Sequence, residues 1–249
     1  SEWVLPVLSR NSKSTGNSTP TGMNQAIIFQ NPSSSDTVQV TIEFLNGDGS
    51  LRTTWSTTVA PNGVSAVSTF QVNGLPTSWG GVGKMTAVVN GTSTPAPILA
   101  LLEPYYSTDS SSGSKIFTTW DAYKAIDPGS GTKTVYLPAV RGGTTTNPVS
   151  SGWLSSINVS NLATLGSSTV QYEFFDQSGA SVGTESQVVA AGGRVGFATS
   201  QLGYLNNFNG SARMTVTSGP EQIAATGSNG LSGFPKSTDA FGMYSGFGN

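Results

Sequence analysis

The sequence contains no cysteine and no histidine. Without cysteine there is no disulfide and no thiolate to act as a nucleophile or metal ligand. Without histidine, the Ser-His-Asp triad and the usual zinc and copper sites are excluded. Because these groups are absent, we predict that the protein is not an enzyme and holds no metal or cofactor. The remaining catalytic candidates are carboxylates, which are considered below.

Charge is also scarce. Charged residues make up 10% of the 249 residues, the formal net charge is −2, and no basic run occurs. The chain therefore lacks the positive surface that nucleic acid requires. The longest apolar run, residues 96–102, is too short to cross a bilayer. We expect neither a nucleic acid partner nor a membrane span.

The hydrophobic residues, 36% of the total, fall in short alternating segments. In residues 37–44, for example, Val38, Val40, Ile42 and Phe44 alternate with polar residues, which is the pattern of a half-buried strand. Similar segments recur along the chain and are separated by turns rich in Gly, Asn and Pro. No long segment has the 3.6-residue period of a helix. The pattern predicts an all-β protein.

The chain contains two copies of one module. The matching segments are LPVL at 5–8 and LPAV at 137–140, GMNQAI at 22–27 and GWLSSI at 152–157, TVQ at 37–39 and at 169–171, and APNG at 60–63 and AAGG at 190–193. About seven short strands per copy predict two tandem immunoglobulin-like antiparallel β-sandwiches, with a small barrel as the competing architecture. We predict domains at 1–126 and 135–249, joined by a linker at 127–134.

Each copy ends on apolar residues three positions apart. They are Trp120, Tyr123 and Ile126 in the first copy and Phe241, Tyr244 and Phe247 in the second. The spacing fits a short helical turn or a packed extended clip, which we interpret as the segment that closes each domain.

The first closing segment leads into the opening strand of the second copy, and the chain stops after the second closing segment. We therefore expect the opening strand of another molecule to follow there, which would join molecules head to tail. The predicted interface residues are Trp3, Val4, Leu5 and Val7 with Phe241, Tyr244 and Phe247. The alternative is that residues 3–8 pair within their own domain.

Other candidate sites have a structural explanation. The segment 46–50 (NGDGS) resembles the start of a calcium loop but lacks the later carboxylate, so a hairpin turn is favoured. Glu43 and Glu173 occupy matching strands of separate domains and cannot form a catalytic pair. Trp79 lies in a predicted loop and is the aromatic most suited to stack on a sugar, although packing is the favoured interpretation.

Four Asn-X-Ser/Thr triplets are present. Asn17, Asn90 and Asn209 are candidate glycosylation sites, and Asn158 falls within a predicted strand. The chain begins with Ser1, which fits an exported and processed protein as well as a trimmed one.

The module pattern resembles tandem β-sandwich repeats of secreted and cell-surface prokaryotic proteins. The shared features are the Leu-Pro-X-Val opening strand, the Gly-Trp-X-Ser entry at 152–155, an Asn that ends this strand (Asn31, Asn161), and a Tyr in each closing segment. The first copy departs from the pattern at Met23. Strand-donating filament subunits have an analogous arrangement.

The resemblance implies extracellular architecture and transfers no catalytic residue. We expect an extracellular structural protein that binds copies of itself in a surface filament or layer through strand donation. The alternatives are a carbohydrate-binding or adhesive module that recognises surface glycans with Trp79, and a virion tail or decoration protein.

Overall fold

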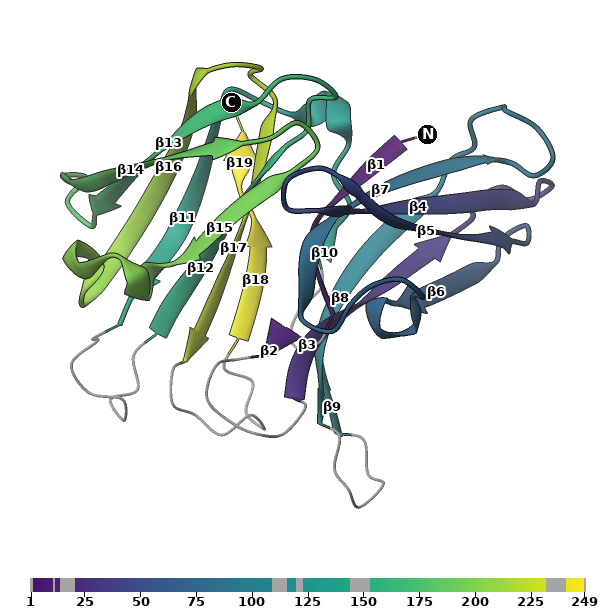
Figure 1. The fold of residues 1–249 in the computed structure, drawn as a ribbon, viewed down its shortest axis with the longest axis horizontal. Helices are drawn as coiled ribbons and strands as arrows, with labels where there is room; N and C mark the ends of the chain where they lie inside the picture. Colours follow the sequence, from purple (N-terminus) through teal and green to yellow (C-terminus); the bar gives the residue numbers. More distant parts are fainter. Residues whose placement is uncertain are drawn as a thin grey trace. The chain divides into compact units, whose positions relative to one another are not determined.

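The computed structural model describes residues 2–10, 12–13, 21–108, 116–119, 123–143, 153–231 and 241–248. These residues form β-strands joined by turns and four short 3-10 turns (Figure 1). The chain divides into two compact units, Ser1–Pro128 and Gly129–Asn249. The division falls inside the stretch 127–134 that the sequence predicts as a linker. Each unit consists of two antiparallel sheets, so the prediction of an all-β protein with tandem sandwiches is confirmed.

In the first unit, sheet A has the order β1-β7-β4-β5, and sheet B has the order β10-β8-β3-β2, with β6 also pairing with β3 and β9 with β8. The strands of this unit are β1 (Glu2–Arg10), β2 (Ser12–Lys13), β3 (Thr21–Gln30), β4 (Val38–Asn46), β5 (Leu51–Val59), β6 (Val64–Ser68), β7 (Trp79–Val89), β8 (Leu99–Thr108), β9 (Ile116–Thr119) and β10 (Tyr123–Lys124).

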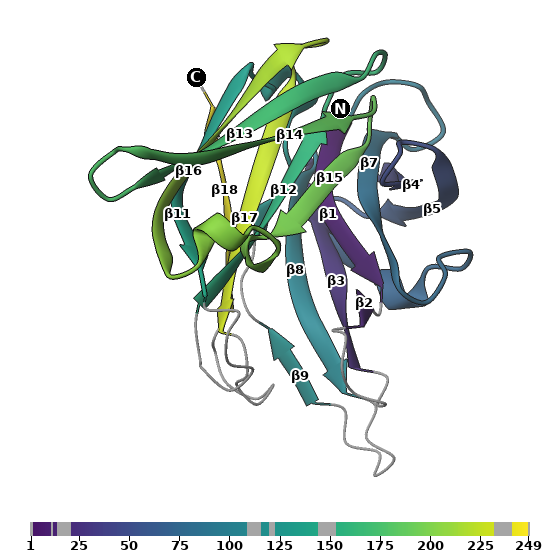
Figure 2. The same ribbon diagram turned by 60° about the vertical axis from the view of Figure 1, so that its left-hand side comes forward.

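The second unit repeats this arrangement. Sheet D has the order β14-β13-β16-β11-β19 and sheet C has the order β15-β12-β17-β18. Figure 2 shows the paired strands β12 and β17 of sheet C side by side. The strands are β11 (Thr134–Gly142), β12 (Trp153–Asn161), β13 (Ser168–Asp176), β14 (Ser181–Val189), β15 (Arg194–Ala198), β16 (Phe208–Ser218), β17 (Ile223–Leu231), β18 (Phe241–Ser245) and β19 (Phe247–Gly248).

The strand order differs from that of an immunoglobulin domain. If the seven main strands of a unit are numbered in sequence, one sheet has the order 1-6-3-4 and the other 5-2-7. An immunoglobulin constant domain instead groups strands 1, 2, 5 and 4 against 3, 6 and 7. The observed order agrees with a jelly roll that lacks its first strand. Sequence alternation shows where strands lie but not which strands pair, because the pairing partners are distant in the sequence.

The two cores follow the predicted alternation. Val38, Val40, Ile42 and Phe44 on β4 are all fully buried, and so are Val170, Tyr172 and Phe174 on β13. In sheet C, Phe197 packs edge-on against Tyr172 and Phe174, with ring centroids 5.1 and 6.1 Å apart. Each sandwich thus has its own core, filled from both sheets.

A buried asparagine ends the second main strand of each unit. In the first unit, Asn31 Nδ2 lies within hydrogen-bonding distance of the carbonyl oxygens of Asp36, Val59 and Ala60, at 2.7, 3.1 and 3.1 Å. Its Oδ1 accepts a hydrogen bond from Ser33 N at 3.0 Å. The side chain therefore joins the β3–β4 loop to the end of β5, and supplies a donor to the buried carbonyl group of Val59.

Asn161 makes the same connections in the second unit. Its Nδ2 donates to the carbonyl oxygens of Gly166 and Val189, at 3.1 and 3.2 Å, and its Oδ1 accepts from Ala163 N at 3.0 Å. The asparagine that the sequence pattern places at the end of this strand is thus a structural clamp in both copies.

Tyr172 is buried in the second core without a hydrogen-bond partner for its hydroxyl among the described residues. A buried unpaired hydroxyl is unfavourable by roughly 1–3 kcal/mol. We therefore expect Tyr172→Phe to increase the free energy of unfolding of the second unit by about 1 kcal/mol, measured by urea denaturation. An unchanged or lower stability would show that the hydroxyl is bonded in solution.

The same substitution should change the response to alkali. Burial raises the pKa of Tyr172 above its ordinary value of 10.0. The unfolded chain then loses the hydroxyl proton at a lower pH than the folded chain. The free energy of unfolding is therefore highest, with respect to this group, below about pH 10, and it falls as the pH rises further. In denaturation curves at about pH 8 and about pH 11, Tyr172→Phe should reduce the alkaline loss of stability.

Candidate assembly flank

The opening strand of each unit contains a proline at an irregularity in its pairing. Strand β1 pairs with β7 through Leu5 opposite Gly83 and Leu8 opposite Gly81, with a register shift between them that contains Pro6. Proline has no N–H group for the ladder and is tolerated at such bulges. In a regular strand, positions 5 and 8 would face opposite sides of the sheet. The extra residue allows Leu5 and Leu8 both to face the core, where both are fully buried.

Strand β11 has the same feature. Leu137 pairs with Ala212 and Val140 with Gly210, and the register shifts between them around Pro138. Leu137 and Val140 are fully buried. The segments LPVL at 5–8 and LPAV at 137–140 therefore each form a bulged strand with core residues on both sides of the bulge.

The closing segments, residues 123–126 and 241–248, each pass from one sheet to the other. In the first unit, β10 pairs with β8, Ala125 N donates to Ala100 O at 3.2 Å, and Ile126 and Val4 exchange two backbone hydrogen bonds of 2.7 and 2.8 Å. The extended clip is thus the form adopted, rather than a helical turn. We call the side of the sandwich that this segment covers the closed flank.

The closing segment of the second unit follows the same path. Strand β18 pairs with β17, Gly246 N donates to Ala225 O at 2.8 Å, and β19 pairs with β11 through Phe247 opposite Tyr136. Gly246 lies at the crossing, where an added Cβ would be 2.4 Å from Val135 Cγ1. A side chain at this position would push the segment away from the sheet.

The structure places the predicted interface residues at the closed flanks. Val4, Leu5 and Val7 are buried and Trp3 is partly buried, all within sheet A of their own unit. In a single molecule, therefore, residues 3–8 pair within their own domain. Phe241, Tyr244 and Phe247 lie on β18 and β19, and their side chains lie outside the described part of the structure.

A buried hydroxyl connects the opening strand to the opposite sheet. Thr69 Oγ1 donates to Ser9 O at 2.7 Å and accepts from Gln25 N at 3.1 Å, while Gln25 Oε1 accepts from Ser9 N. Ser9 lies on β1 and Gln25 on β3, so these bonds join the two sheets. This network was not predicted from the sequence.

The second unit has an equivalent network. Thr199 Oγ1 donates to Arg141 O at 2.7 Å and accepts from Ser155 N at 3.1 Å, and Ser155 Oγ accepts from Arg141 N at 2.8 Å. A threonine at the same place in both copies, in STFQ at 68–71 and ATSQ at 198–201, is the sequence signal that could have revealed it.

Trp79 is not an exposed platform, which corrects the expectation that it lies in an exposed loop. It begins β7, is only 5% exposed, and packs edge-on against Phe44 with ring centroids 5.9 Å apart. Its Nε1 donates to Asn46 Oδ1 at 3.2 Å. The indole folds inward because Gly81 has no side chain: a Cβ there would lie 2.4 Å from Trp79 Cζ2.

The predicted glycosylation sites are located as follows. Asn90 is exposed in the turn after β7, and Asn209 is exposed on β16. Asn17 lies outside the described residues. Asn209 is paired with Arg141 of β11, whereas Asn90 lies in a turn.

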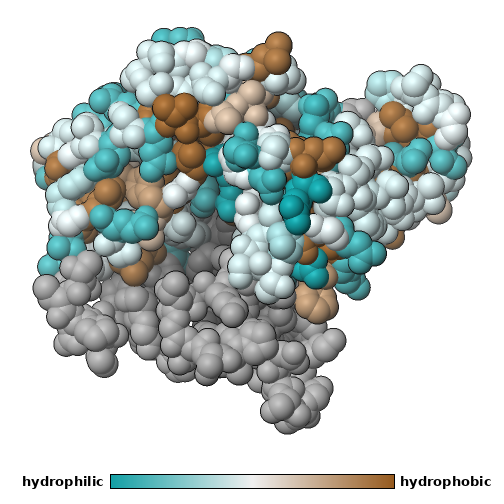
Figure 3. Space-filling view, viewed as in Figure 1, coloured by the Kyte–Doolittle hydropathy of each residue, from teal (hydrophilic) through white to brown (hydrophobic). Residues whose placement is uncertain are grey.

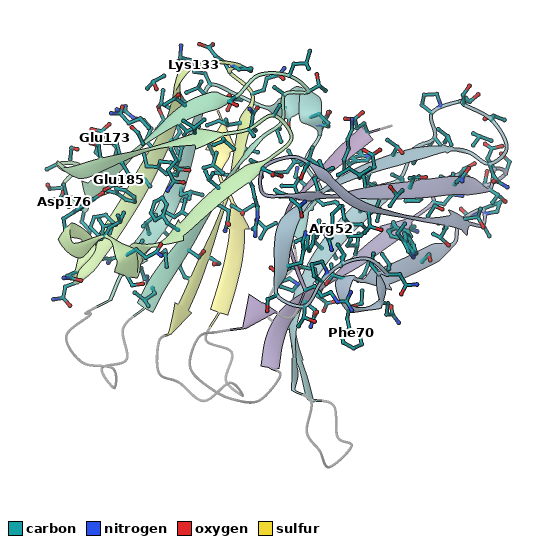
Figure 4. The ribbon with its side chains drawn as sticks, viewed as in Figure 1. Arg52, Phe70, Lys133, Glu173, Asp176 and Glu185 are labelled. Carbon is teal, nitrogen blue, oxygen red and sulfur yellow. The ribbon has the colours of Figure 1, made fainter. Side chains whose placement is uncertain are left out.

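The acidic residues serve turns and cross-strand pairs. Figure 4 labels Glu173 and Asp176 of the second unit. Glu173 forms an ion pair with Arg213 on the neighbouring strand, and Glu2 forms one with Lys84 at 3.2 Å. These are exposed or partly exposed pairs, so each contributes roughly 0–1 kcal/mol. Within the described ranges, no group of three or more acidic side chains could hold a metal ion.

The two hairpin turns are stabilised by the aspartates. In the first turn, Asp48 Oδ1 accepts hydrogen bonds from Ser50 Oγ and Ser50 N, which lower the pKa of the carboxyl. In the second turn, Ser178 Oγ and Ala180 N are the corresponding main donors and lower the pKa of Asp176. The sequence NGDGS thus forms a hairpin turn, as predicted.

No family model and no curated protein matches the sequence. Among solved structures, that of Thermotoga maritima 1070 is similar to 48% of this chain and covers 97% of its own, with 11% identity and a TM-score of 0.37. The PBSX exported protein XepA covers 93% of this chain and 85% of its own, with 12% identity and a TM-score of 0.23.

A mutant of the major pilin from Streptococcus pyogenes covers 82% of this chain and 81% of its own, with 10% identity and a TM-score of 0.22. These scores are too low for the function of any of these proteins to be transferred to this chain. In the part of the chain that the structure describes, no helix is long and apolar enough to cross a membrane.

Proposed function

We propose that this chain is an extracellular structural protein without catalytic activity, and that it joins copies of itself head to tail in a surface filament or layer. The observation that carries the proposal is the construction of the closed flank. The opening strand is the last main strand of its sheet, and its outer side contacts only the short closing segment in the described residues. An edge strand in this position has one neighbouring main strand, so its exchange breaks and re-forms the pairing with β7 and the bonds of Ser9 to Thr69 and Gln25.

The proposed exchange involves the following strands. Strand β1 would leave β7 of its own molecule and form the same pairs with β7 of the next, placing Trp3, Val4, Leu5 and Val7 in the interface. The strand pairs that are broken within one molecule form again between two molecules, which is the energetic basis of strand swapping. Phe241, Tyr244 and Phe247 lie on β18 and β19, which pair with β17 and β11 of the second unit, so they take no part in the exchange of β1.

Other features of the described residues support a structural role. The buried amides and hydroxyls of Asn31, Asn161, Thr69 and Thr199 all serve to connect strands. A low charge content and a sequence rich in hydroxyls and amides suit a protein that packs against copies of itself. With Trp79 buried, the glycan-binding alternative loses its main residue.

Deleting residues 1–8 would be a poor test, because Leu5 and Leu8 belong to the core and each contributes roughly 1.5–3 kcal/mol. A better test fixes β1 in its own sheet. Glu2 and Thr86 are direct cross-strand partners, and the chain has no cysteine of its own. We expect the oxidised Glu2→Cys/Thr86→Cys variant to form no polymer, and to polymerise again after reduction, as measured by light scattering and negative-stain electron microscopy.

The second unit provides the matched control. Thr134 and Thr215 are the equivalent partners on β11 and β16. A disulfide between cysteines at these two positions should leave polymerisation unchanged, since the opening strand of the second unit is not the one exchanged. Polymers of the same length from the oxidised Glu2→Cys/Thr86→Cys variant would reject strand exchange. A wild-type protein that stays monomeric at every concentration would reject the proposed function itself.

A further inference from the structure

Each sandwich has a second flank that no closing segment covers in the described residues. Strand β5 ends sheet A and β14 ends sheet D. Both strands contain nine residues and show the same alternation of exposed and partly buried positions. Thr54, Ser56 and Thr58 of β5 are exposed. Edge strands of this length present backbone N–H and C=O groups to which another strand can pair.

The two edges differ at their central residue. In β14 the centre is Glu185, whose Oε1 accepts a hydrogen bond from the Tyr204 hydroxyl at 3.3 Å. The Tyr204 ring fits there because Gly183 has no side chain: a Cβ would be 2.5 Å from the ring. In β5 the equivalent residue is Trp55, whose ring packs against Phe29 with centroids 5.9 Å apart.

A charge in an edge strand is a common protection against unwanted pairing. Strand β14 carries such a charge at its centre, on Glu185. Strand β5 has one charged residue, Arg52, which lies near its first residue and donates from Nε to Gly74 O at 3.0 Å. Figure 4 shows Arg52 and Glu185 on their strands. The centre of β5 is therefore uncharged.

We propose that β5 pairs with β5 of a second copy, antiparallel and about a two-fold axis at Trp55. This inference rests on the proposed function, since it supplies a lateral contact between head-to-tail strings. The two-fold axis places Trp55 opposite Trp55 of the second copy, and Thr54 opposite Ser56. Aromatic cross-strand pairs stabilise a sheet, and no like charges face each other.

The second copy is the occupant because this edge is complementary to itself. Two nine-residue strands centred on the same residue overlap over their whole length. The same pairing of two β14 strands would place Glu185 opposite Glu185, which is unfavourable. On the face drawn in Figure 3, the described surface is mostly hydrophilic, and its hydrophobic areas are separate from one another.

The register can be tested by charge at two exposed positions. In the double variant Thr54→Lys/Ser56→Lys, lysines face lysines across the two-fold axis, and we expect the dimer dissociation constant to rise by at least about tenfold. In Thr54→Lys/Ser56→Glu, each lysine faces a glutamate, and we expect the dissociation constant to stay within about threefold of the wild type. Sedimentation equilibrium on the full chain measures both.

The second unit again offers a matched control. Thr184 and Ser186 are the equivalent exposed residues of β14. Thr184→Lys/Ser186→Lys should leave dimerisation unchanged, and thermal unfolding should show that all three variants remain folded. Dimerisation that survives Thr54→Lys/Ser56→Lys, or that Thr54→Lys/Ser56→Glu also abolishes, would overturn the proposed register.

Failure of this inference is distinguishable from failure of the proposed function. The oxidised Glu2→Cys/Thr86→Cys variant should still dimerise through β5 while forming no strings. Thr54→Lys/Ser56→Lys should still form strings that do not associate laterally. Strings whose lateral association is unaffected by Thr54→Lys/Ser56→Lys would overturn the β5 contact and leave head-to-tail assembly standing. A wild-type chain without any dimer would overturn the β5 contact.

Discussion

Asn31→Ala is expected to destabilise the first unit by about 2–3 kcal/mol. The substitution removes the donor that serves the carbonyl oxygens of Asp36, Val59 and Ala60, of which the bond to Val59 is buried and the other two are partly buried. Leaving a buried polar group unpaired costs roughly 1–3 kcal/mol, so the loss exceeds that of a typical single hydrogen bond. Hydrogen exchange measured by peptide should show reduced protection in β3, β4 and β5.

The duplication provides the control for this experiment. Asn161→Ala should produce the same loss in the second unit, in β12, β13 and β14, and leave the first unit protected. Asn31→Asp keeps the oxygen that accepts from Ser33 N and loses the amide donor, so it should also be strongly destabilising. A loss below about 1 kcal/mol for Asn31→Ala would mean that water replaces the side chain at these carbonyl groups.

Gly81→Ala is expected to destabilise the first unit by about 3 kcal/mol or more. An added Cβ would lie 2.0 Å from Leu45 O and 2.4 Å from Trp79 Cζ2. Neither the backbone of β4 nor the indole can move without separating β4 from β7 or expelling Trp79 from the core. Chemical denaturation gives the stability, and the emission maximum of tryptophan fluorescence should move to longer wavelength as Trp79 becomes exposed.

Gly210 occupies the equivalent position in the second unit, where a Cβ would lie 2.0 Å from Phe175 O and 2.7 Å from Phe208 Cζ. Gly210→Ala should therefore be destabilising to a similar extent. Gly203 is the contrast, because an added Cβ there would have no atom within 4 Å. A similar loss for Gly203→Ala would show that the effect comes from the backbone freedom of glycine rather than from the close approach.

Much of the fold could be predicted from local patterns. The alternation in residues 37–44 predicts a strand with one buried face, and the repeated segments predict a second copy of the same sandwich. Both inferences use neighbouring residues, whose geometry follows from the two-residue period of a strand. The turn at 46–50 was predicted in the same way, from residues that bond to each other.

The candidate site was harder to predict because its contacts join distant residues. The pairing of β1 with β7, the strand order in each sheet, and the hydrogen bonds of Thr69 all connect segments far apart in the chain. Periodicity carries no information on such partners. The same applies to Trp79, whose environment depends on Asn46 and Phe44.

Residue patterns alone were therefore enough to establish an all-β, duplicated chain built without cysteine or histidine chemistry. The folded arrangement was needed to show that β1 completes its own sheet and that Trp79 is buried. It also identified β5 and β14 as the strands at which sheets A and D end. Burial and pairing depend on which strands become neighbours. The packing of the whole sandwich decides which strands are neighbours, and the sequence of a single segment does not.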